Sequence, residues 1–192
     1  MNQARSVVIC PVCQQVQPFR FLPLLIVCGP SGVGKSTACA QLAGTIPEAV
    51  LLEGDILWQP AFNQPETLYR TFFETWLRLA KNISQSGRPV VLFIAGGIPE
   101  NIEPCVEVHY FAKVCYLALI CEEAVLRERL QQRPAWRMSS QAAFMDQQVR
   151  FNQQLLDRAN TMQPPVDLLD TSTRSVAQAA HEVAAWIRKA LC

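Results

Sequence analysis

The sequence predicts an α/β protein in which a five-stranded parallel sheet is covered by helices on both faces. Short, continuous apolar runs, which are typical of strands buried on both sides, alternate with longer segments of helical periodicity. This alternation is typical of β-α-β units, in which each helix returns the chain to start another parallel strand. The expected strands are residues 22–28, 49–52, 89–95, 113–120 and 166–169.

The segments between these strands are expected to form helices. Three of them place apolar side chains at helical spacing, which predicts one buried face each. Pro134 and the polar stretch 137–141 interrupt the helical pattern between residues 122 and 159, which predicts a mobile segment. The stripes are Leu68, Phe72, Trp76, Leu79 and Ile83 within 66–85; Phe144, Gln148, Phe151 and Leu155; and Val176, Ala180, Val183, Ile187 and Leu191.

Composition limits the classes of function that fit this chain. It has 192 residues, of which 50% are hydrophobic and 17% charged, which is ordinary for a globular domain with a substantial core. The formal net charge of +1 provides no broad basic surface, so nucleic acid is not an expected partner. No apolar run approaches the roughly 18 residues of a membrane span. No secretory signal is apparent, and a cytoplasmic location is expected.

Residues 1–20 precede the first strand and are expected to be an N-terminal extension of a domain formed by residues 21–192. Only two of the eight cysteines, Cys10 and Cys13, have the spacing of metal ligands. A zinc site needs a second pair of ligands, and the sequence has no second C-x-x-C or H-x₃₋₅-H. We therefore expect a disordered or lightly packed extension. A zinc ion shared between two molecules stays open as the alternative.

The segment 29–37, GPSGVGKST, fits the phosphate-loop pattern G-x-x-x-x-G-K-[ST]. It lies between the first strand and a helix-compatible segment, which is the context the pattern requires. Its backbone N–H groups and the positive end of the helix dipole attract phosphate oxygens. Lys35 is expected to reach the β- and γ-phosphates and Ser36 to bind Mg²⁺. The expected ATP-binding residues of the loop are Gly29, Ser31, Gly32, Val33, Gly34, Lys35, Ser36 and Thr37.

Two acids, Glu53 and Asp55, follow the second strand. The carboxyl ends of parallel strands meet at the edge of the sheet that carries the phosphate loop, so both acids are expected there. One acid can hold Mg²⁺ and the other can accept a proton from an attacking hydroxyl. The third strand ends at Gly96 and Gly97 without an aspartate, so we expect Ser36 and Glu53 to hold the metal. Asp55 is the expected base, with a helix cap as the alternative.

Arginines crowd the segment after the fourth strand. Arg129 and Arg133 share a helix face, and Pro134 opens a short loop that carries Arg137. A lid at about residues 133–143 would bring these arginines onto the transferring phosphates and exclude water. Residues at i,i+4 spacing on a helix form surface ion pairs instead. This spacing predicts pairing of Arg127 with Glu123, and of Arg70 and Arg78 with Glu74.

From residue 22 onward the chain resembles the small phosphate-loop kinases that include adenylate, shikimate and gluconate kinases. The resemblance implies a three-layer fold with strand order 2-3-1-4-5 and a lid over ATP. Glu53-Gly54-Asp55 is similar to the acid-x-acid pair that binds Mg²⁺ and activates the acceptor in the shikimate and gluconate types. Gly96-Gly97 likewise resembles their glycine-rich end of strand three, where kinases of nucleoside monophosphates have an aspartate.

Further motifs carry the same resemblance. The segment 128–133, ERLQQR, resembles the pre-lid motif, which implies that Arg129 stacks on adenine and that Arg133 contacts phosphate. The segment 170–176 is similar to the one after strand five that cradles the base, which places Thr171 at the nucleotide. Arg150 resembles a post-lid arginine, although Asp146 offers it a structural partner. Trp58 can stack on a ring substrate or anchor its own loop.

Three functions fit these observations. We expect an ATP-dependent kinase that transfers the γ-phosphoryl group to a hydroxyl of a small-molecule acceptor. Asp55 would be the base, with Lys35 and Arg133 stabilising charge. The arginine-rich lid also fits a nucleoside or nucleoside monophosphate kinase. A regulatory module that binds nucleotide without transfer is the third possibility, and the paired acids argue against it.

Overall fold

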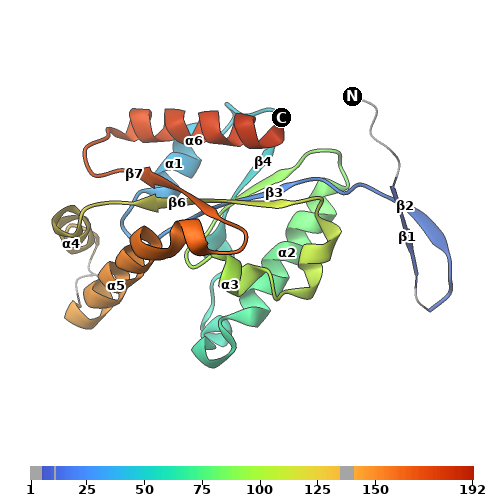
Figure 1. Cartoon of the computed structure of the whole chain (residues 1–192), viewed down its shortest axis with the longest axis horizontal. Helices are drawn as coiled ribbons and strands as arrows, with labels where there is room; N and C mark the ends of the chain where they lie inside the picture. The colour runs from blue at the N-terminus through green and yellow to red at the C-terminus, as the bar shows by residue number, and fades with distance from the viewer. Residues whose placement is uncertain (1–5, 11, 135–140) are drawn as a thin grey trace.

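A five-stranded parallel sheet lies at the centre of the structure (Figure 1). The computed structural model describes residues 6–10, 12–134 and 141–192. The order of strands is 2-3-1-4-5 in sequence terms, which confirms the expected α/β fold and strand order. Across the sheet the strands are β4 (Val50–Glu53), β5 (Val90–Phe93), β3 (Leu24–Cys28), β6 (Val114–Ile120) and β7 (Val166–Asp170).

The central strand β3 explains why the expected strands are continuous apolar runs. It pairs with both β5 and β6, and all five of its side chains are buried. Successive side chains of a strand point to opposite faces of the sheet. Leu24 and Ile26 accordingly pack into the core on one face, whereas Leu25 and Val27 pack into the core on the other. Neither face is left for polar residues.

Helices cover both faces of this sheet (Figure 1). Apolar residues of α1, α4 and α6 form one core with the sheet, and apolar residues of α2 and α3 form the other, while α5 contributes to both. Among the described residues, none of the helices is long and apolar enough to cross a membrane. The bounds are α1 (Lys35–Leu42), α2 (Arg70–Ser84), α3 (Pro99–Ile102), α4 (Glu123–Gln131), α5 (Ala142–Arg158) and α6 (Val176–Leu191).

The helix expected over residues 66–85 begins only at Arg70. Leu68 and Tyr69 have φ angles of 53° and 56°, in the left-handed region that ends or precedes a helix rather than continuing it. A short 3₁₀ turn, η3 (Pro65–Thr67), replaces the first part of the expected helix. The other 3₁₀ turns are η1 (Gly54–Leu57), η2 (Pro60–Phe62), η4 (Val106–Tyr110) and η6 (Ala159–Thr161).

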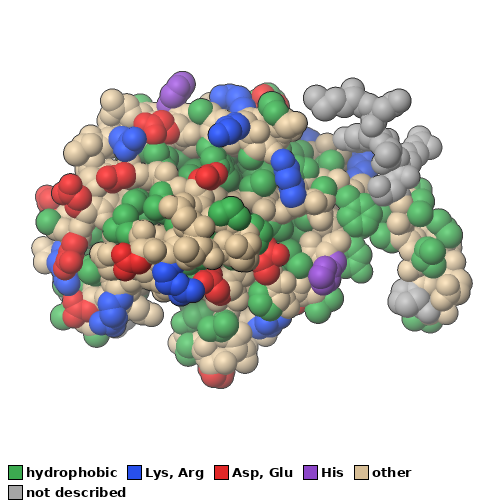
Figure 2. Space-filling model, viewed as in Figure 1, with side chains coloured by type: hydrophobic (Ala, Val, Ile, Leu, Met, Phe, Trp, Pro, Cys, Tyr) green, Lys and Arg blue, Asp and Glu red, His purple; other side chains and the backbone are tan. Residues whose placement is uncertain are grey.

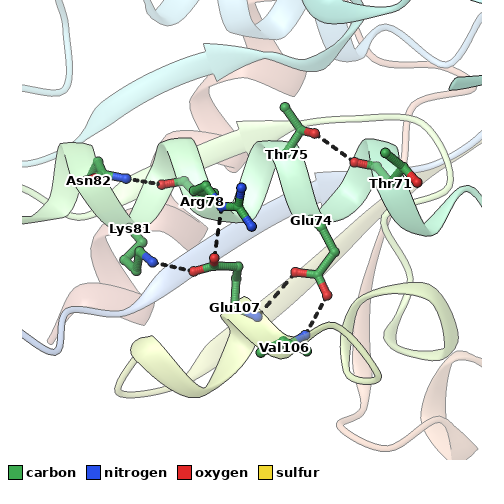
Figure 3. Close-up of polar contacts among 8 residues, drawn as sticks. All are labelled: Thr71, Glu74, Thr75, Arg78, Lys81, Asn82, Val106 and Glu107. Carbon is green, nitrogen blue, oxygen red and sulfur yellow. Dashed lines mark hydrogen bonds and ion pairs between the residues drawn. The ribbon is translucent and has the colours of Figure 1, made fainter. Parts of the chain in front are cut away.

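Glu74 of α2 does not pair with the arginines one turn away. Its carboxylate accepts hydrogen bonds from the backbone N–H groups of Val106 (2.6 Å) and Glu107 (3.3 Å), which caps the start of η4 (Figure 3). Arg70 donates to the carbonyl of Pro104 instead. The expected pairs of Glu74 with Arg70 and Arg78 are therefore wrong, because the start of η4 offers Glu74 unsatisfied backbone donors.

The carboxylate of Glu107 completes the contact between α2 and η4. It accepts hydrogen bonds from Arg78 Nε (3.0 Å) and Lys81 Nζ (2.5 Å), and its side chain is almost fully buried (Figure 3). Burial by itself raises the pKa of Glu107, but the two cationic partners outweigh it and the pKa is lowered below 4.5. The charged form of Glu107 therefore stabilises the folded protein.

We expect the Glu107→Gln variant to lose about 1.5–3 kcal/mol of unfolding free energy, because hydrogen bonds to charged partners are lost. A carboxyl whose pKa is lowered on folding stabilises the protein above its unfolded pKa, near 4.5, and this contribution disappears as pH falls through the lowered folded pKa. Urea denaturation at pH 7 and between pH 3 and 5 measures both effects. The difference between Glu107→Gln and wild type should shrink in acid, whereas the exposed Glu66→Gln control should match wild type throughout.

The N-terminal segment forms an antiparallel hairpin, although the sequence predicts a disordered or lightly packed extension there. Strands β1 (Ser6–Ile9) and β2 (Val16–Phe19) pair with each other as a separate two-stranded sheet and project from the side of the domain (Figure 1). The ring of Phe19 lies 4.8 Å from that of Phe21 and 5.6 Å from that of Tyr110, measured between centroids. These contacts tie the base of the hairpin to the domain.

Candidate active site

A cavity of about 380 Å³ opens at the carboxyl ends of the central strands. The phosphate loop forms one wall, and residues from four other parts of the chain complete the lining. The structure thus brings together nearly all of the residues that the sequence predicts for the site. The lining consists of residues 31–38 with Asp55, Ala95, Arg129, Arg133, Thr171, Arg174, Ser175, Val176 and Ala179.

The phosphate loop connects β3 to α1 through a turn that requires glycine. Gly29, Gly32 and Gly34 have φ angles of 128°, 93° and 101°, which side chains rarely adopt. A Cβ atom at Gly29 would also lie only 2.2 Å from the carbonyl oxygen of Leu119 on β6. The chain then enters α1 at Lys35, so the loop and the positive end of that helix border the same cavity. This arrangement suits an anion.

Lys35 is held across the mouth of the loop. Its Nζ donates hydrogen bonds to the carbonyl oxygens of Gly29 (2.8 Å) and Pro30 (2.9 Å). Burial lowers the pKa of Lys35 to about 8, and the nearby charge of Asp55 opposes this shift. The half-buried ammonium group thus lines the cavity, where a phosphate oxygen can replace the backbone carbonyls as its partner.

Ser36 and Glu53 fit a magnesium ion. The Ser36 hydroxyl donates to Glu53 Oε1 at 2.7 Å, so two oxygen atoms of the kind that Mg²⁺ prefers lie together at the end of β4. Within the described ranges, no group of three or more His, Cys, Asp or Glu side chains could hold a metal. The hydroxyl of Ser36 and the carboxylate of Glu53 suit Mg²⁺, which is usually bound by one or two protein oxygens, several waters and substrate phosphates.

Asp55 lies in the first turn of η1 and lines the cavity. It does not cap this turn, because the N-cap is Glu53 and makes no side-chain capping bond. Gly54 between the two acids packs so closely on the end of β5 that a Cβ would lie 2.9 Å from the Phe93 carbonyl oxygen and 2.6 Å from Cγ1 of the next residue, Ile94. The indole Nε1 of the buried Trp76 donates to the Gly54 carbonyl at 3.1 Å. Core contacts from β5 and α2 therefore set the position of the acid pair.

Gly96 and Gly97 follow β5, and backbone geometry accounts for both of them. Gly96 has a φ of 66°, and its carbonyl accepts a hydrogen bond from the Asn101 side chain at 2.8 Å. A Cβ at Gly97 would lie 2.6 Å from Ile94 Cγ2 and 2.9 Å from Ile26 Cγ2. A tight turn against the core explains these glycines without an acceptor substrate.

Arg129 and Thr171 form a polar link below the phosphate loop. The Arg129 guanidinium donates to the hydroxyl of Thr171 (3.1 Å) and to its carbonyl (2.8 Å). The buried Thr171 hydroxyl has one proton, which it can donate to the carbonyl of Val33 (3.1 Å) or to that of Ile120 (3.0 Å). One hydroxyl thus connects the loop, the end of β6 and the arginine expected at adenine.

We expect Thr171→Val to destabilise the protein by about 1–3 kcal/mol, because the Val33 carbonyl loses this donor and Arg129 loses an acceptor. ATP affinity should fall as well, since Val33 and Arg129 are no longer held. Chemical denaturation and calorimetric titration with Mg-ATP measure the two effects. Thr173→Val is the matched control, because Thr173 lies two residues away and is exposed. Equal behaviour of the two variants would contradict this role of Thr171.

The arginines around α4 divide into two sets. Arg133 NH1 donates to Ser31 Oγ at 2.8 Å, so Arg133 already contacts the phosphate loop. Arg127 pairs with Glu123 at 2.8 Å, as expected, and with Asp146 at 2.9 Å. Arg150 is exposed and does not line the cavity. Arg137 and most of the lid expected at 133–143 lie outside the described residues.

Two side chains near the site, Gln148 and Arg174, were not expected there, and Trp58 follows one of its two expected roles. Gln148 of α5 accepts a hydrogen bond from the Ser31 N–H at 2.8 Å; its signal in the sequence is a polar residue within an apolar stripe. Arg174 lines the cavity and pairs with Glu182 at 2.6 Å. Trp58 does not line it, and its ring packs near Phe72, with 5.1 Å between centroids. These contacts match those of a loop anchor.

Comparison with known proteins places this site in a family. Residues 24–154 match the family model described as an AAA domain. The chain belongs to this AAA domain family. The match includes the phosphate loop, the acid pair, Arg129 and Arg133, and it ends before Thr171. No curated protein matches the sequence of this AAA domain protein significantly.

Solved structures of kinases share the fold of this AAA domain protein. A gluconokinase from Sinorhizobium meliloti 1021 is 20% identical and superposes with a TM-score of 0.62; the match covers 90% of this chain and 95% of the gluconokinase. A sugar kinase from Janibacter sp. HTCC2649 is 17% identical with a TM-score of 0.61, covering 89% and 96%. A shikimate kinase from Bacteroides thetaiotaomicron is 18% identical with a TM-score of 0.53, covering 87% and 98%. The chain therefore has the P-loop kinase fold.

Proposed function

We propose that the protein is a kinase that transfers the γ-phosphoryl group of Mg-ATP to a hydroxyl group of a small molecule. The position of Asp55 carries this proposal. A phosphate loop alone provides for nucleotide binding, whereas transfer to a hydroxyl also uses a base beside the acceptor. Asp55 lines the same cavity as Lys35 and is anchored there by the core contacts of Gly54. A carboxylate held at the cavity beside the carboxyl ends of the strands is suited to act as a base.

The other residues have roles that follow from their charge and position. Lys35 and Arg133 would bind phosphate oxygens and stabilise the charge that develops on the transferred group. Ser36 and Glu53 would hold Mg²⁺, which neutralises charge between the β- and γ-phosphates when bound. Arg129 and Thr171 would form the side of the cavity that receives the base, together with Arg137 from the lid. Asp55 would accept the proton of the attacking hydroxyl.

The fold neighbours support a small hydroxylated acceptor. Their names describe kinases of gluconate, sugars and shikimate, all of which act on small polar molecules with hydroxyl groups. Arg129, Arg133 and Arg174 line the cavity and favour a second candidate, a nucleoside or nucleoside monophosphate kinase. A regulatory module that binds nucleotide without transferring phosphate is the third possibility.

Coupled detection of ADP tests these functions. The protein with Mg-ATP is offered sugars and sugar acids, nucleosides, and nucleoside monophosphates in separate reactions. ADP formation that requires a free acceptor hydroxyl, and that stops when this hydroxyl is methylated, supports the proposal. Activity confined to nucleosides or their monophosphates would establish the second candidate. Saturable ATP binding without ADP formation for any of these classes would favour the regulatory module.

A further inference from the structure

Two cysteines lie together at the tip of the β1–β2 hairpin. Cys10 follows β1, and the turn is closed by hydrogen bonds from the Cys10 N–H to the Gln15 carbonyl (3.0 Å) and from the Gln14 N–H to the Cys10 carbonyl (2.9 Å). Gln14 has a φ of 58°, which lets the chain reverse direction within this short turn. Cys13 lies between these contacts and is exposed. Both thiols are free.

The turn brings the two thiols together. The backbone N–H groups of Cys13 and Val12 donate to the Cys10 sulfur, and the Cys13 thiol also hydrogen-bonds with it. These contacts place the two sulfur atoms side by side. Two cysteines separated by two residues have the spacing of a zinc-ligand pair.

The cysteines inside the domain are less accessible, and most of them are buried. Burial raises the pKa of Cys28 to about 12 and those of Cys39 and Cys105 to about 11. Burial also raises the pKa values of Cys115 and Cys121. These thiols are components of the core, whereas the pair at the hairpin tip is accessible to a ligand.

The pair supplies half of a zinc site. Structural zinc is bound by four ligands in tetrahedral geometry, commonly four cysteine thiolates. Among the described residues, no third or fourth His, Cys, Asp or Glu side chain joins Cys10 and Cys13 in a possible metal cluster. A four-thiolate site would take its other two ligands from another molecule. A second copy of the chain carries an identical pair, and a two-fold axis through the metal would bring both pairs together.

The hairpin also has an apolar face without a partner. The strand register sets Val7 opposite Pro18 and Ile9 opposite Val16, so these four side chains share one face. Val7, Ile9 and Val16 are 53%, 58% and 57% exposed, and Figure 2 shows hydrophobic side chains on the projecting arm. An isolated two-stranded hairpin is marginally stable in water. The opposite face includes Phe19, which packs on the domain.

We propose that Cys10 and Cys13 bind Zn²⁺ as half of a four-thiolate site, and that a second copy of this chain completes it. Each thiol releases its proton as the metal binds, so one Zn²⁺ replaces up to four protons and no electron is transferred. The apolar faces of the two hairpins then lie near the same metal, where they can be buried between the copies. This dimer is independent of the kinase activity proposed above.

The full-length protein, reduced and supplied with zinc, tests the proposal. We expect half a zinc ion per chain by elemental analysis and the mass of a dimer by light scattering. The double variant Cys10→Ser/Cys13→Ser should lose the zinc and become monomeric. Cys192→Ser should keep both, because Cys192 is an exposed cysteine elsewhere on the protein. Ile9→Ser/Val16→Ser should weaken the dimer and leave the four thiolates in place.

Further measurements separate this proposal from other uses of the pair. Replacement of zinc by Co²⁺ should produce the intense sulfur charge-transfer bands of a tetrahedral four-thiolate site, at half an equivalent per chain. The double variant should melt at the same temperature as the chelated wild type, since the hairpin lies outside the sheet. One zinc per monomer, a stable Cys10–Cys13 disulfide in place of zinc, or a dimer that survives in the double variant would each overturn the proposal.

Discussion

Replacement of Asp55 by asparagine is expected to abolish phosphoryl transfer and to leave ATP affinity largely unchanged. Asparagine has nearly the same shape but cannot accept the proton of the acceptor hydroxyl. Loss of a general base typically lowers turnover by about 10²–10⁴. Asp55 is exposed at the cavity and lies in no strand of the sheet, so the fold should tolerate the change. Steady-state turnover and calorimetric titration with Mg-ATP measure the two properties.

A matched control distinguishes the loss of a base from a general loss of charge. Asp157 is an exposed aspartate on α5, and Asp157→Asn should behave like wild type in both measurements. Turnover of Asp55→Asn above about a tenth of wild type would contradict the assignment, because the loss would fall below the range of general-base catalysis. The base would then have to be another group at the cavity.

Replacement of Lys35 by methionine is expected to lower both turnover and ATP affinity. Methionine keeps much of the length of the side chain and loses the charge that would bind phosphate oxygens. Removal of one group that stabilises charge in the transition state costs about 10²–10³ in turnover. Lys35 also donates to the carbonyls of Gly29 and Pro30, so the loop itself should loosen. The same turnover and calorimetric measurements apply, with thermal unfolding as a check on the fold.

Two comparisons sharpen the result for Lys35. Lys189→Met removes a charge from the exposed side of α6 and should change neither property. Lys35→Arg keeps the charge, so it should retain more ATP affinity than Lys35→Met, although the bulkier guanidinium should still impair turnover. ATP affinity of Lys35→Met equal to that of wild type would place the triphosphate elsewhere and remove the basis of the proposed kinase.

The central part of the fold could be predicted because its signals are local. A strand buried on both faces must be apolar at every position, and β3 and β6 are read directly from such runs. The phosphate loop is equally local, since its glycines adopt backbone angles that other residues rarely reach. The strand order is different. It came from the resemblance to kinases, because no residue of a strand specifies which neighbour it pairs with.

The contacts that were not predicted join residues distant in sequence. Arg78 and Glu107 are 29 residues apart, and only the fold reveals that η4 passes α2 with a buried carboxylate. The anchoring of the acid pair by Trp76 and Ile94 likewise depends on how β4, β5 and α2 pack. The hairpin was missed for another reason: each strand has only four residues, and polar glutamines occupy its turn. Short elements carry too little periodicity to be recognised.

Because the Ser31 N–H donates to the side chain of Gln148, one backbone donor of the phosphate loop already has an acceptor within the protein. A phosphate oxygen can bind this N–H only by displacing the neutral side-chain amide of Gln148. The observed affinity for any nucleotide is then the difference between two competing acceptors, one on the ligand and one on the protein. The side chain of Gln148 thus competes with the nucleotide for the Ser31 N–H. Its displacement would remove a direct contact between α5 and the phosphate loop when the loop binds phosphate.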